Sequence, residues 1–201
     1  MILSCNNALS DHKVHVFPFA TSERLEPQFY KDIADCNLAV FSTHGGPIHG
    51  TLQLRSELDR WFSLSYGNNK LGQGICNYVF LASCSMMGYF NIEKDAPKPL
   101  ETDWMNGKIV SGLRMACGFD GNAVTGGRNG WRYYGWYNKG DSISDSWCFS
   151  GVDDNDINDP VSVSYGTTAS DAIANLADGR FLTVKVESKF AASSEWKSIK
   201  E

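Results

Sequence analysis

Two runs of consecutive apolar residues constrain the fold of this 201-residue chain more than any other feature. Leu38–Ser42 reads Leu-Ala-Val-Phe-Ser, and Tyr78–Ala82 reads Tyr-Val-Phe-Leu-Ala. Strands that are apolar on both faces are typical of a parallel sheet that is covered on each side. Ile109–Cys117 is expected to add one more strand. We therefore expect an α/β protein in which helices cover both faces of a mostly parallel sheet.

The segment between the two runs has the spacing of an amphipathic helix. Thr51 is a residue type that often caps a helix at its amino end. Apolar residues follow at helical intervals: Leu54, Leu58, Trp61 and Phe62. We expect a helix here, and it would form the right-handed crossover between two neighbouring parallel strands.

The second half of the chain has a less regular pattern. Gly118–Gly140 is rich in glycine and aromatic residues and is expected to form a long loop. Ile143–Phe149 is expected to form a short helix. Thr168 and Asp171 have the spacing of a capping box, which predicts a further helix. Phe181–Glu187 alternates apolar and polar residues, which predicts a half-buried edge strand.

Composition and charge fit one globular domain that spans residues 1–201. A net charge of −5 argues against a nucleic acid or an anionic membrane as the partner. No apolar run approaches the length of a membrane-spanning helix. The amino terminus has neither the basic region nor the apolar core of a signal peptide. The expected compartment is therefore the cytoplasm, and secretion is the alternative if the chain is a processed fragment.

The cysteines do not have the pattern of a disulfide framework or a zinc site. They are scattered evenly: Cys5, Cys36, Cys76, Cys84, Cys117 and Cys148. Disulfide frameworks are denser and occur in shorter chains, and no Cys-x-x-Cys pair suggests zinc. We interpret most of these residues as reduced thiols that pack in the core.

The positions of the histidines restrict which kind of nucleophilic site the chain can build. There are four histidines: His12, His15, His44 and His49. A cysteine or serine nucleophile usually needs a histidine base, and none follows residue 49. For Cys84 this excludes the Cys-then-His order of papain-like enzymes and class I glutamine amidotransferases, and the Ser-Asp-His order of α/β hydrolases. The order that remains is histidine first and cysteine second.

His44 and Cys84 have this order, and each follows one of the apolar runs. Ligands of open α/β sheets bind beyond the carboxyl ends of the strands, so the two side chains are expected to meet there. His44 would act as general base, Cys84 would attack as a thiolate, and the amides of Gly45 and Cys84 would stabilise an oxyanion. The plainer alternative is a turn histidine beside a structural cysteine.

The same residues resemble a known family. Ala39–Gly45 ends in His-Gly after a hydrophobic strand, and Tyr78–Cys84 ends in cysteine after a second one. These blocks are similar to the signature of the caspase–gingipain–legumain superfamily of cysteine peptidases (clan CD), over about residues 36–120. The resemblance implies a caspase-like three-layer α/β sandwich that hydrolyses peptides or proteins through a Cys84 thioester, without a cofactor. Gly112–Phe149 further resembles a bacterial branch of this superfamily.

The family's substrate specificity does not transfer directly. Cys84 stands between Ser83 and Ser85, unlike the caspase sequence Gln-Ala-Cys-Arg-Gly. Some relatives that cleave after arginine have an aspartate two residues before the nucleophile, where this chain has Ala82. By analogy with the superfamily, Asp120 and Trp131 would lie near the primary specificity pocket, and Asp120 would favour a basic residue.

Two further interpretations concern ligands. The aromatic residues of the 131–137 loop could instead bind peptide or carbohydrate on an inactive peptidase fold. Asp154, Asp156 and Asn158 match the opening of a calcium loop, although Tyr165 occupies the position of its final glutamate. A solvated turn is the expectation for this acidic cluster, with calcium as the alternative. The sequence does not indicate an oligomeric state.

Overall fold

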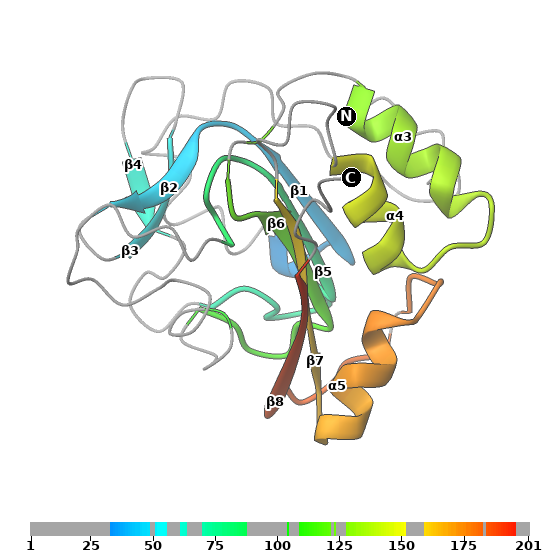
Figure 1. The fold of residues 1–201 in the computed structure, drawn as a ribbon. Coiled ribbons are helices and arrows are strands. Elements are labelled where there is room, and N and C mark those ends of the chain that lie inside the picture. Colours follow the sequence, from blue (N-terminus) through cyan, green and yellow to red (C-terminus); the bar gives the residue numbers. More distant parts are fainter. Residues whose placement is uncertain are drawn as a thin grey trace.

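The computed structural model describes residues 33–48, 51–55, 61–63, 70–87, 104, 109–121, 123, 128–151, 159–182 and 184–195. Its centre is a five-stranded mixed sheet with the strand order β1-β5-β6-β7-β8 (Figure 1). The strands are β1 (Leu38–Ser42), β5 (Tyr78–Ala82), β6 (Met115–Phe119), β7 (Pro160–Gly166) and β8 (Phe190–Glu195).

The two apolar runs form the predicted strands with the predicted bounds. β1 pairs in parallel with β5, from Leu38 opposite Tyr78 to Ser42 opposite Ala82. β6 pairs in parallel with β5, but β7 and β8 are antiparallel to their neighbours. The α/β class is confirmed. The expected mostly parallel sheet is wrong, because half of the strand pairings in the central sheet are antiparallel.

Burial on both faces explains why β5 is apolar throughout. Val79 and Leu81 belong to one hydrophobic cluster, and Tyr78, Phe80 and Ala82 belong to the other. Successive side chains of a strand point to opposite faces, so a strand buried on both faces cannot alternate with polar residues.

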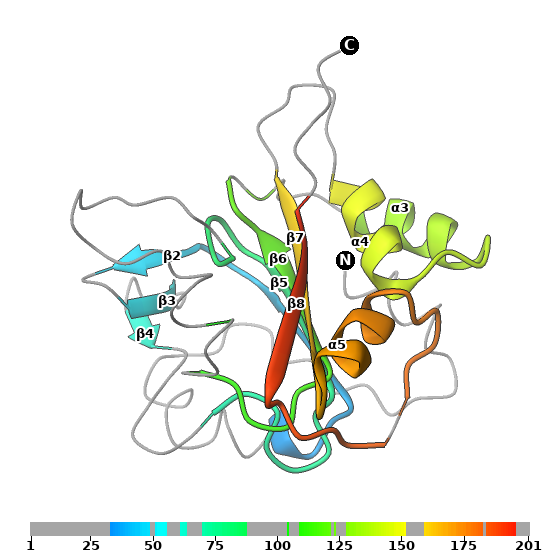
Figure 2. The same cartoon turned by 60° about the horizontal axis from the view of Figure 1, so that its bottom comes forward.

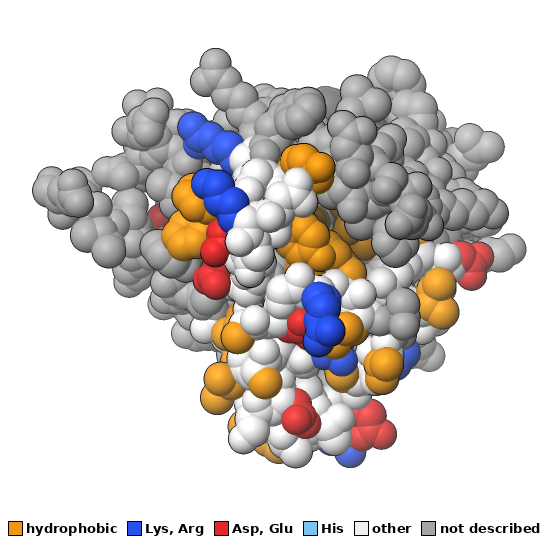
Figure 3. Space-filling view, turned by 90° about the vertical axis from the view of Figure 1, so that its right-hand side faces the viewer, with side chains coloured by type: hydrophobic (Ala, Val, Ile, Leu, Met, Phe, Trp, Pro, Cys, Tyr) orange, Lys and Arg blue, Asp and Glu red, His pale blue; other side chains and the backbone are white. Residues whose placement is uncertain are grey.

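Among the described residues, three helices cover one face of the sheet: α3 (Arg128–Tyr137), α4 (Ile143–Gly151) and α5 (Ala169–Leu176) (Figures 1 and 2). Tyr133 of α3 and Trp147 of α4 pack in the same cluster as Phe80. We call this the helix face. Figure 3 views this side, where apolar side chains gather at the centre of the described surface among scattered charged residues. None of the described helices is long and apolar enough to cross a membrane.

On the opposite face of the sheet, the described residues do not form the full layer of helices that we expected. Ile33, from the helical residues 33–34, packs there with Leu71, Met86 and Trp104. The described residues on this face also include an isolated parallel bridge between Leu71 and Val110, and a second, three-stranded sheet lies on this side of the molecule (Figures 1 and 2).

The helix expected to begin at Thr51 is wrong. Its place is taken by an antiparallel sheet of β2 (Gly45–Ile48), β3 (Thr51–Arg55) and β4 (Trp61–Ser63). Thr-Leu-Gln-Leu-Arg also alternates polar and apolar residues, and short runs fit both periods. Pairing of Ile48 with Thr51 makes β2 and β3 a hairpin whose ladder satisfies the backbone groups that the two strands turn toward each other.

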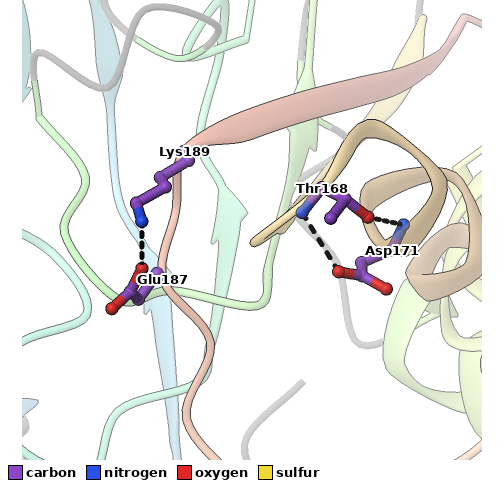
Figure 4. A network of polar contacts seen from close by, with 4 residues as sticks. All are labelled: Thr168, Asp171, Glu187 and Lys189. Carbon is purple, nitrogen blue, oxygen red and sulfur yellow. Dashed lines mark hydrogen bonds and ion pairs between the residues drawn. The ribbon is translucent and has the colours of Figure 1, made fainter.

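The capping box is confirmed at the start of α5 (Figure 4). The hydroxyl of Thr168 accepts from the N–H of Asp171 at 3.1 Å, and the Asp171 carboxylate accepts from the N–H of Thr168 at 3.0 Å. The predicted edge strand at Phe181–Glu187 is wrong, because the described residues of this range lie outside any strand and the edge strands of the sheet are β1 and β8. Glu187 instead pairs with Lys189 at 2.5 Å just before that strand.

The remaining strand and helix predictions are partly correct. α4 confirms the helix expected at Ile143–Phe149. The strand expected at Ile109–Cys117 begins only at Met115, although Ile109 and Val110 are buried. The long loop expected at Gly118–Gly140 is wrong in part, because α3 occupies its second half.

Candidate active site

His44 and Cys84 lie at the same edge of the sheet, beyond neighbouring strands. Ser42 and Ala82 are the last paired residues of β1 and β5, and each candidate stands two residues further along the chain. Neighbouring strands are about 4.8 Å apart. This register therefore brings the two candidates to equivalent positions at the carboxyl ends of parallel strands.

Close packing joins the turn after His44 to the segment around Cys84. A Cβ atom added to Gly45 would lie 2.6 Å from the sulfur of Met86 and 2.9 Å from the Cβ of Ser83. Real Cβ atoms essentially never come this close to such atoms. Gly45 is therefore required for the turn that carries His44 to rest on the segment that carries Cys84.

The two candidates differ in their surroundings. Cys84 is half-buried and packs against the helix-face cluster, following Phe80 and Ala82. In β1, Leu38 and Val40 pack against the same cluster. His44 is exposed. The candidate site thus offers an exposed imidazole and a half-buried thiol, each two residues beyond the paired end of its strand.

Backbone groups fix the position of Cys84. The N–H of Ala123 donates a hydrogen bond to the Cys84 sulfur at 3.3 Å. The N–H of Ser85 donates to the carbonyl of Gly121 at 2.8 Å. Ser85 has φ of 52°, in the left-handed region that non-glycine residues rarely adopt. Such strain is maintained only where the surroundings over-determine the backbone, and it is frequent at functional sites.

Two buried hydrogen bonds hold the segment that follows Cys84 and Ser85. The indole N–H of Trp104 donates to the carbonyl of Met86 at 2.7 Å, and the hydroxyl of Tyr165 donates to the carbonyl of Trp104 at 3.1 Å. Trp104 and Tyr165 are almost completely buried. Trp104 and Ala123 support the site, but no motif in the sequence marks them.

Asp120 lies at the same edge as Cys84. It directly follows β6, and its N–H donates to the carbonyl of Asp159 at 2.7 Å. The next residue, Gly121, accepts the hydrogen bond from Ser85. The half-buried Asp120 is therefore one residue from a direct contact with the loop of the candidate nucleophile.

The aromatic segment 131–137 is helical rather than a loop, which corrects the sequence interpretation. Tyr133 and Tyr137, four residues apart on α3, stack with ring centroids 5.9 Å apart. Tyr133 also meets Phe80 edge-on at 5.4 Å. Two of the five aromatic residues in this segment thus pack against the sheet. The side chain of Trp131 lies outside the described part of the structure.

The remaining described contacts of this segment are also internal. Trp136 packs against Phe149 of α4 with ring centroids 5.0 Å apart. The ammonium of Lys139 lies 4.0 Å from the centre of the Trp136 ring. These contacts join α3 to α4 and leave Trp136 half-buried.

The other described cysteines have different surroundings from Cys84. Cys76, Cys117 and Cys148 are buried. Burial raises the pKa of the Cys76 thiol to about 12, and it raises the pKa of Cys117 even further. Thiols held protonated in this way are poor nucleophiles at neutral pH. Cys36 is half-buried at the opposite edge of the sheet.

The calcium alternative at Asp154, Asp156 and Asn158 lies outside the described residues. Within the described ranges, no three His, Cys, Asp or Glu side chains come together as a metal site would require. Comparison of the chain with known proteins gave no match to a family model, to a curated protein or to a solved structure.

Proposed function

We propose that this protein is a cysteine peptidase in which Cys84 is the nucleophile and His44 is the general base and acid. The observation that carries the proposal is the register of β1 and β5. It brings a histidine and a cysteine to equivalent positions beyond neighbouring parallel strands, as ligand sites of α/β sheets require. The proposal includes a caspase-like arrangement of the sandwich, supported by the parallel order β1-β5-β6.

The proposed reaction has two stages. His44 takes the proton of the Cys84 thiol, and the sulfur attacks the carbonyl carbon of the scissile bond. The amides of Gly45 and Cys84 would stabilise the oxyanion of the tetrahedral intermediate. His44 then gives its proton to the leaving amine, which leaves a thioester on Cys84. Water activated by His44 hydrolyses the thioester and restores the thiol.

Two features of the surroundings direct positive partial charge toward the end of the sheet that holds Cys84. The amide of Ala123 already donates to the Cys84 sulfur. Tyr137 of α3 contacts Phe181, and Phe181 contacts Tyr78 at the amino end of β5. Tyr133, one turn earlier in α3, contacts the middle of β5. The amino end of α3, which carries the positive end of the helix dipole, is therefore directed toward the edge that holds Cys84.

Asp120 gives the proposal a substrate preference. Its place beside the Cys84 loop would put a carboxylate near the residue that precedes the scissile bond. A carboxylate there would favour a lysine or arginine side chain of the substrate. Asp120→Asn should then lower kcat/KM for peptides with a basic residue at this position and leave kcat/KM for neutral peptides nearly unchanged.

The test combines activity with active-site labelling. The full chain is incubated with a fluorogenic peptide library, and a parallel sample is labelled with iodoacetamide and mapped by mass spectrometry. We expect cleavage and preferential labelling of Cys84, with loss of cleavage in Cys84→Ala and His44→Ala. Cys36→Ala, which changes a half-buried thiol at the opposite edge, is the matched control and should keep activity. A native chain that cleaves no peptide and leaves Cys84 unlabelled would exclude the proposed activity.

A further inference from the structure

A second pair of facing residues lies at the opposite edge of the sheet from the candidate active site. Leu38 and Tyr78 are the first paired residues of β1 and β5. Cys36 and Cys76 each stand two residues before this pair. The two cysteines therefore stand at equivalent positions along the chain, just before the paired strands begin.

Hydrogen bonds hold these two segments together on both sides of the cysteines. After the cysteines, the N–H of Asn77 donates to the carbonyl of Asn37 at 3.0 Å. Before them, the N–H of Ile75 donates to the carbonyl of Ala34 at 2.8 Å. Cys36 and Cys76 are thus confined to adjacent backbone segments.

The chemistry of the pair is unequal. Cys36 is half-buried and can be reached from solvent, whereas Cys76 is completely buried. Burial is the main cause that raises the pKa of Cys76. Negative charge on Cys36 raises it further and the ammonium of Lys185 lowers it, so both groups lie within electrostatic range of the Cys76 sulfur. Adjacent strands are about 4.8 Å apart, within the Cα separation of about 4.4–6.8 Å that a disulfide bond spans.

We propose that Cys36 and Cys76 are a redox-sensitive pair that forms a reversible disulfide by exchange with a small-molecule disulfide. In the first step, the Cys36 thiolate attacks one sulfur of the reagent, and the reagent's S–S bond breaks to release one thiolate. In the second step, the Cys76 thiolate attacks the Cys36 sulfur of this mixed disulfide and releases the second thiolate. Two protein thiols are oxidised, one small disulfide is reduced to two thiols, and the protons pass to the released thiolates.

The bond would join the starts of β1 and β5 and close the chain segment that contains His44. A cross-link of this kind stabilises a protein chiefly by restricting its unfolded state. The inference does not depend on peptidase activity, because it concerns the edge of the sheet away from Cys84.

The direct test is oxidation of the folded full chain with glutathione disulfide as the probe, followed by alkylation, digestion and mass spectrometry. We expect a cross-linked peptide pair that contains Cys36 and Cys76, together with a Tm that rises on oxidation and returns after reduction. The fully buried Cys117 and Cys148 should stay unmodified. Cys84→Ala should retain the cross-link, which separates this result from the fate of the peptidase proposal.

Substitutions distinguish the two steps. Cys76→Ser should stop the reaction at a glutathione adduct on Cys36, and Cys36→Ser should leave Cys76 unmodified. If Cys76→Ser does not fold, the wild-type peptide map and the Cys36→Ser variant still show whether Cys36 and Cys76 form a disulfide. A wild-type chain that retains the adduct on Cys36, or that joins Cys36 to a different cysteine, would overturn the inference.

The rate of the second step gives an independent check. Because Cys76 is deprotonated only at high pH, closure from the mixed disulfide should accelerate by about tenfold per pH unit between neutral pH and about pH 9. Lys185→Met should slow closure, since it removes the ammonium that lowers the pKa of Cys76. Closure at a rate independent of pH would contradict attack by the buried thiol.

Discussion

Gly45 lies so close to Ser83 that a methyl group on Gly45 would stand 2.9 Å from the Ser83 Cβ. The contact joins the residue that follows His44 to the residue that precedes Cys84. It shows that the turn after β1 and the turn after β5 pack directly against each other. The separation of the two candidate catalytic residues therefore depends on Gly45 having no side chain.

Substitution of Gly45 should therefore disturb both stability and the site. Gly45→Ala places a Cβ against Ser83 and Met86, and overpacking of this kind costs about 1–3 kcal/mol. We expect a lower free energy of unfolding in urea and slower iodoacetamide labelling of Cys84. Gly46→Ala is the matched control, because nothing lies within 4 Å of a Cβ at Gly46. Equal stability of the two variants would show that the turn yields without cost.

The backbone of Ser85 gives a second prediction. Its φ of 52° costs a non-glycine residue about 1–2 kcal/mol relative to the right-handed region, whereas glycine adopts it readily. Ser85→Gly should raise the free energy of unfolding by up to about 1 kcal/mol, since the greater freedom of unfolded glycine offsets part of the gain. Ser85→Ala keeps the strain and should not gain stability. Thermal and urea unfolding of both variants give the comparison, and a Ser85→Gly protein less stable than Ser85→Ala would contradict it.

Asn175 of α5 should be important for stability. Its side-chain carbonyl accepts from the guanidinium of Arg114 at 2.5 Å, and its amide donates to the carbonyl of Tyr165 at 2.6 Å. Asn175→Ala leaves two buried polar groups without these partners, at a cost of about 2–4 kcal/mol. Ile173→Ala, on the same helix with 64% of its residue surface exposed, should change stability by less than about 0.5 kcal/mol. Urea unfolding would contradict the prediction if both variants lost stability equally.

The buried thiols predict that the fold weakens in alkali. Burial, and then charge on Cys36, raises the pKa of Cys76 from 9.0 to about 12. Below about pH 9 this thiol is protonated in both states, so its contribution to stability is complete. Between about pH 9 and 12 the unfolded chain releases the proton and the folded chain keeps it, so the free energy of unfolding falls by about 1.4 kcal/mol per pH unit.

Cys76→Ala tests this linkage. The variant should lose less stability than wild type when urea midpoints are compared at about pH 8 and about pH 10. Cys117 and Tyr165, whose pKa values burial also raises, keep some pH dependence in both proteins. If stability fell with pH equally in the variant and the wild type, Cys76 would not contribute to the loss of stability in alkali.

The local sequence determined those elements whose pattern fits only one arrangement. Leu38–Ser42 and Tyr78–Ala82 both form the expected strands, although only β5 is buried throughout and β1 is a mostly half-buried edge strand with Ser42 exposed. Thr168 and Asp171 fix the start of α5 through bonds between near neighbours. The sequence order of His44 and Cys84 after these strands was likewise readable from the chain alone, because strand direction sets which edge a following residue reaches.

The tertiary structure decided what depends on partners distant in sequence. Thr51–Arg55 fits a helix or a strand, and pairing with Gly45–Ile48 selected the strand. Residues 131–137 formed a helix because Tyr133 and Tyr137 could pack on the sheet. The surroundings of Cys84 arose in the same way, since loops brought together by parallel pairing supplied its contacts. Backbone hydrogen bonds and close packing act between any residues that meet in space, so no pattern in the sequence could specify them.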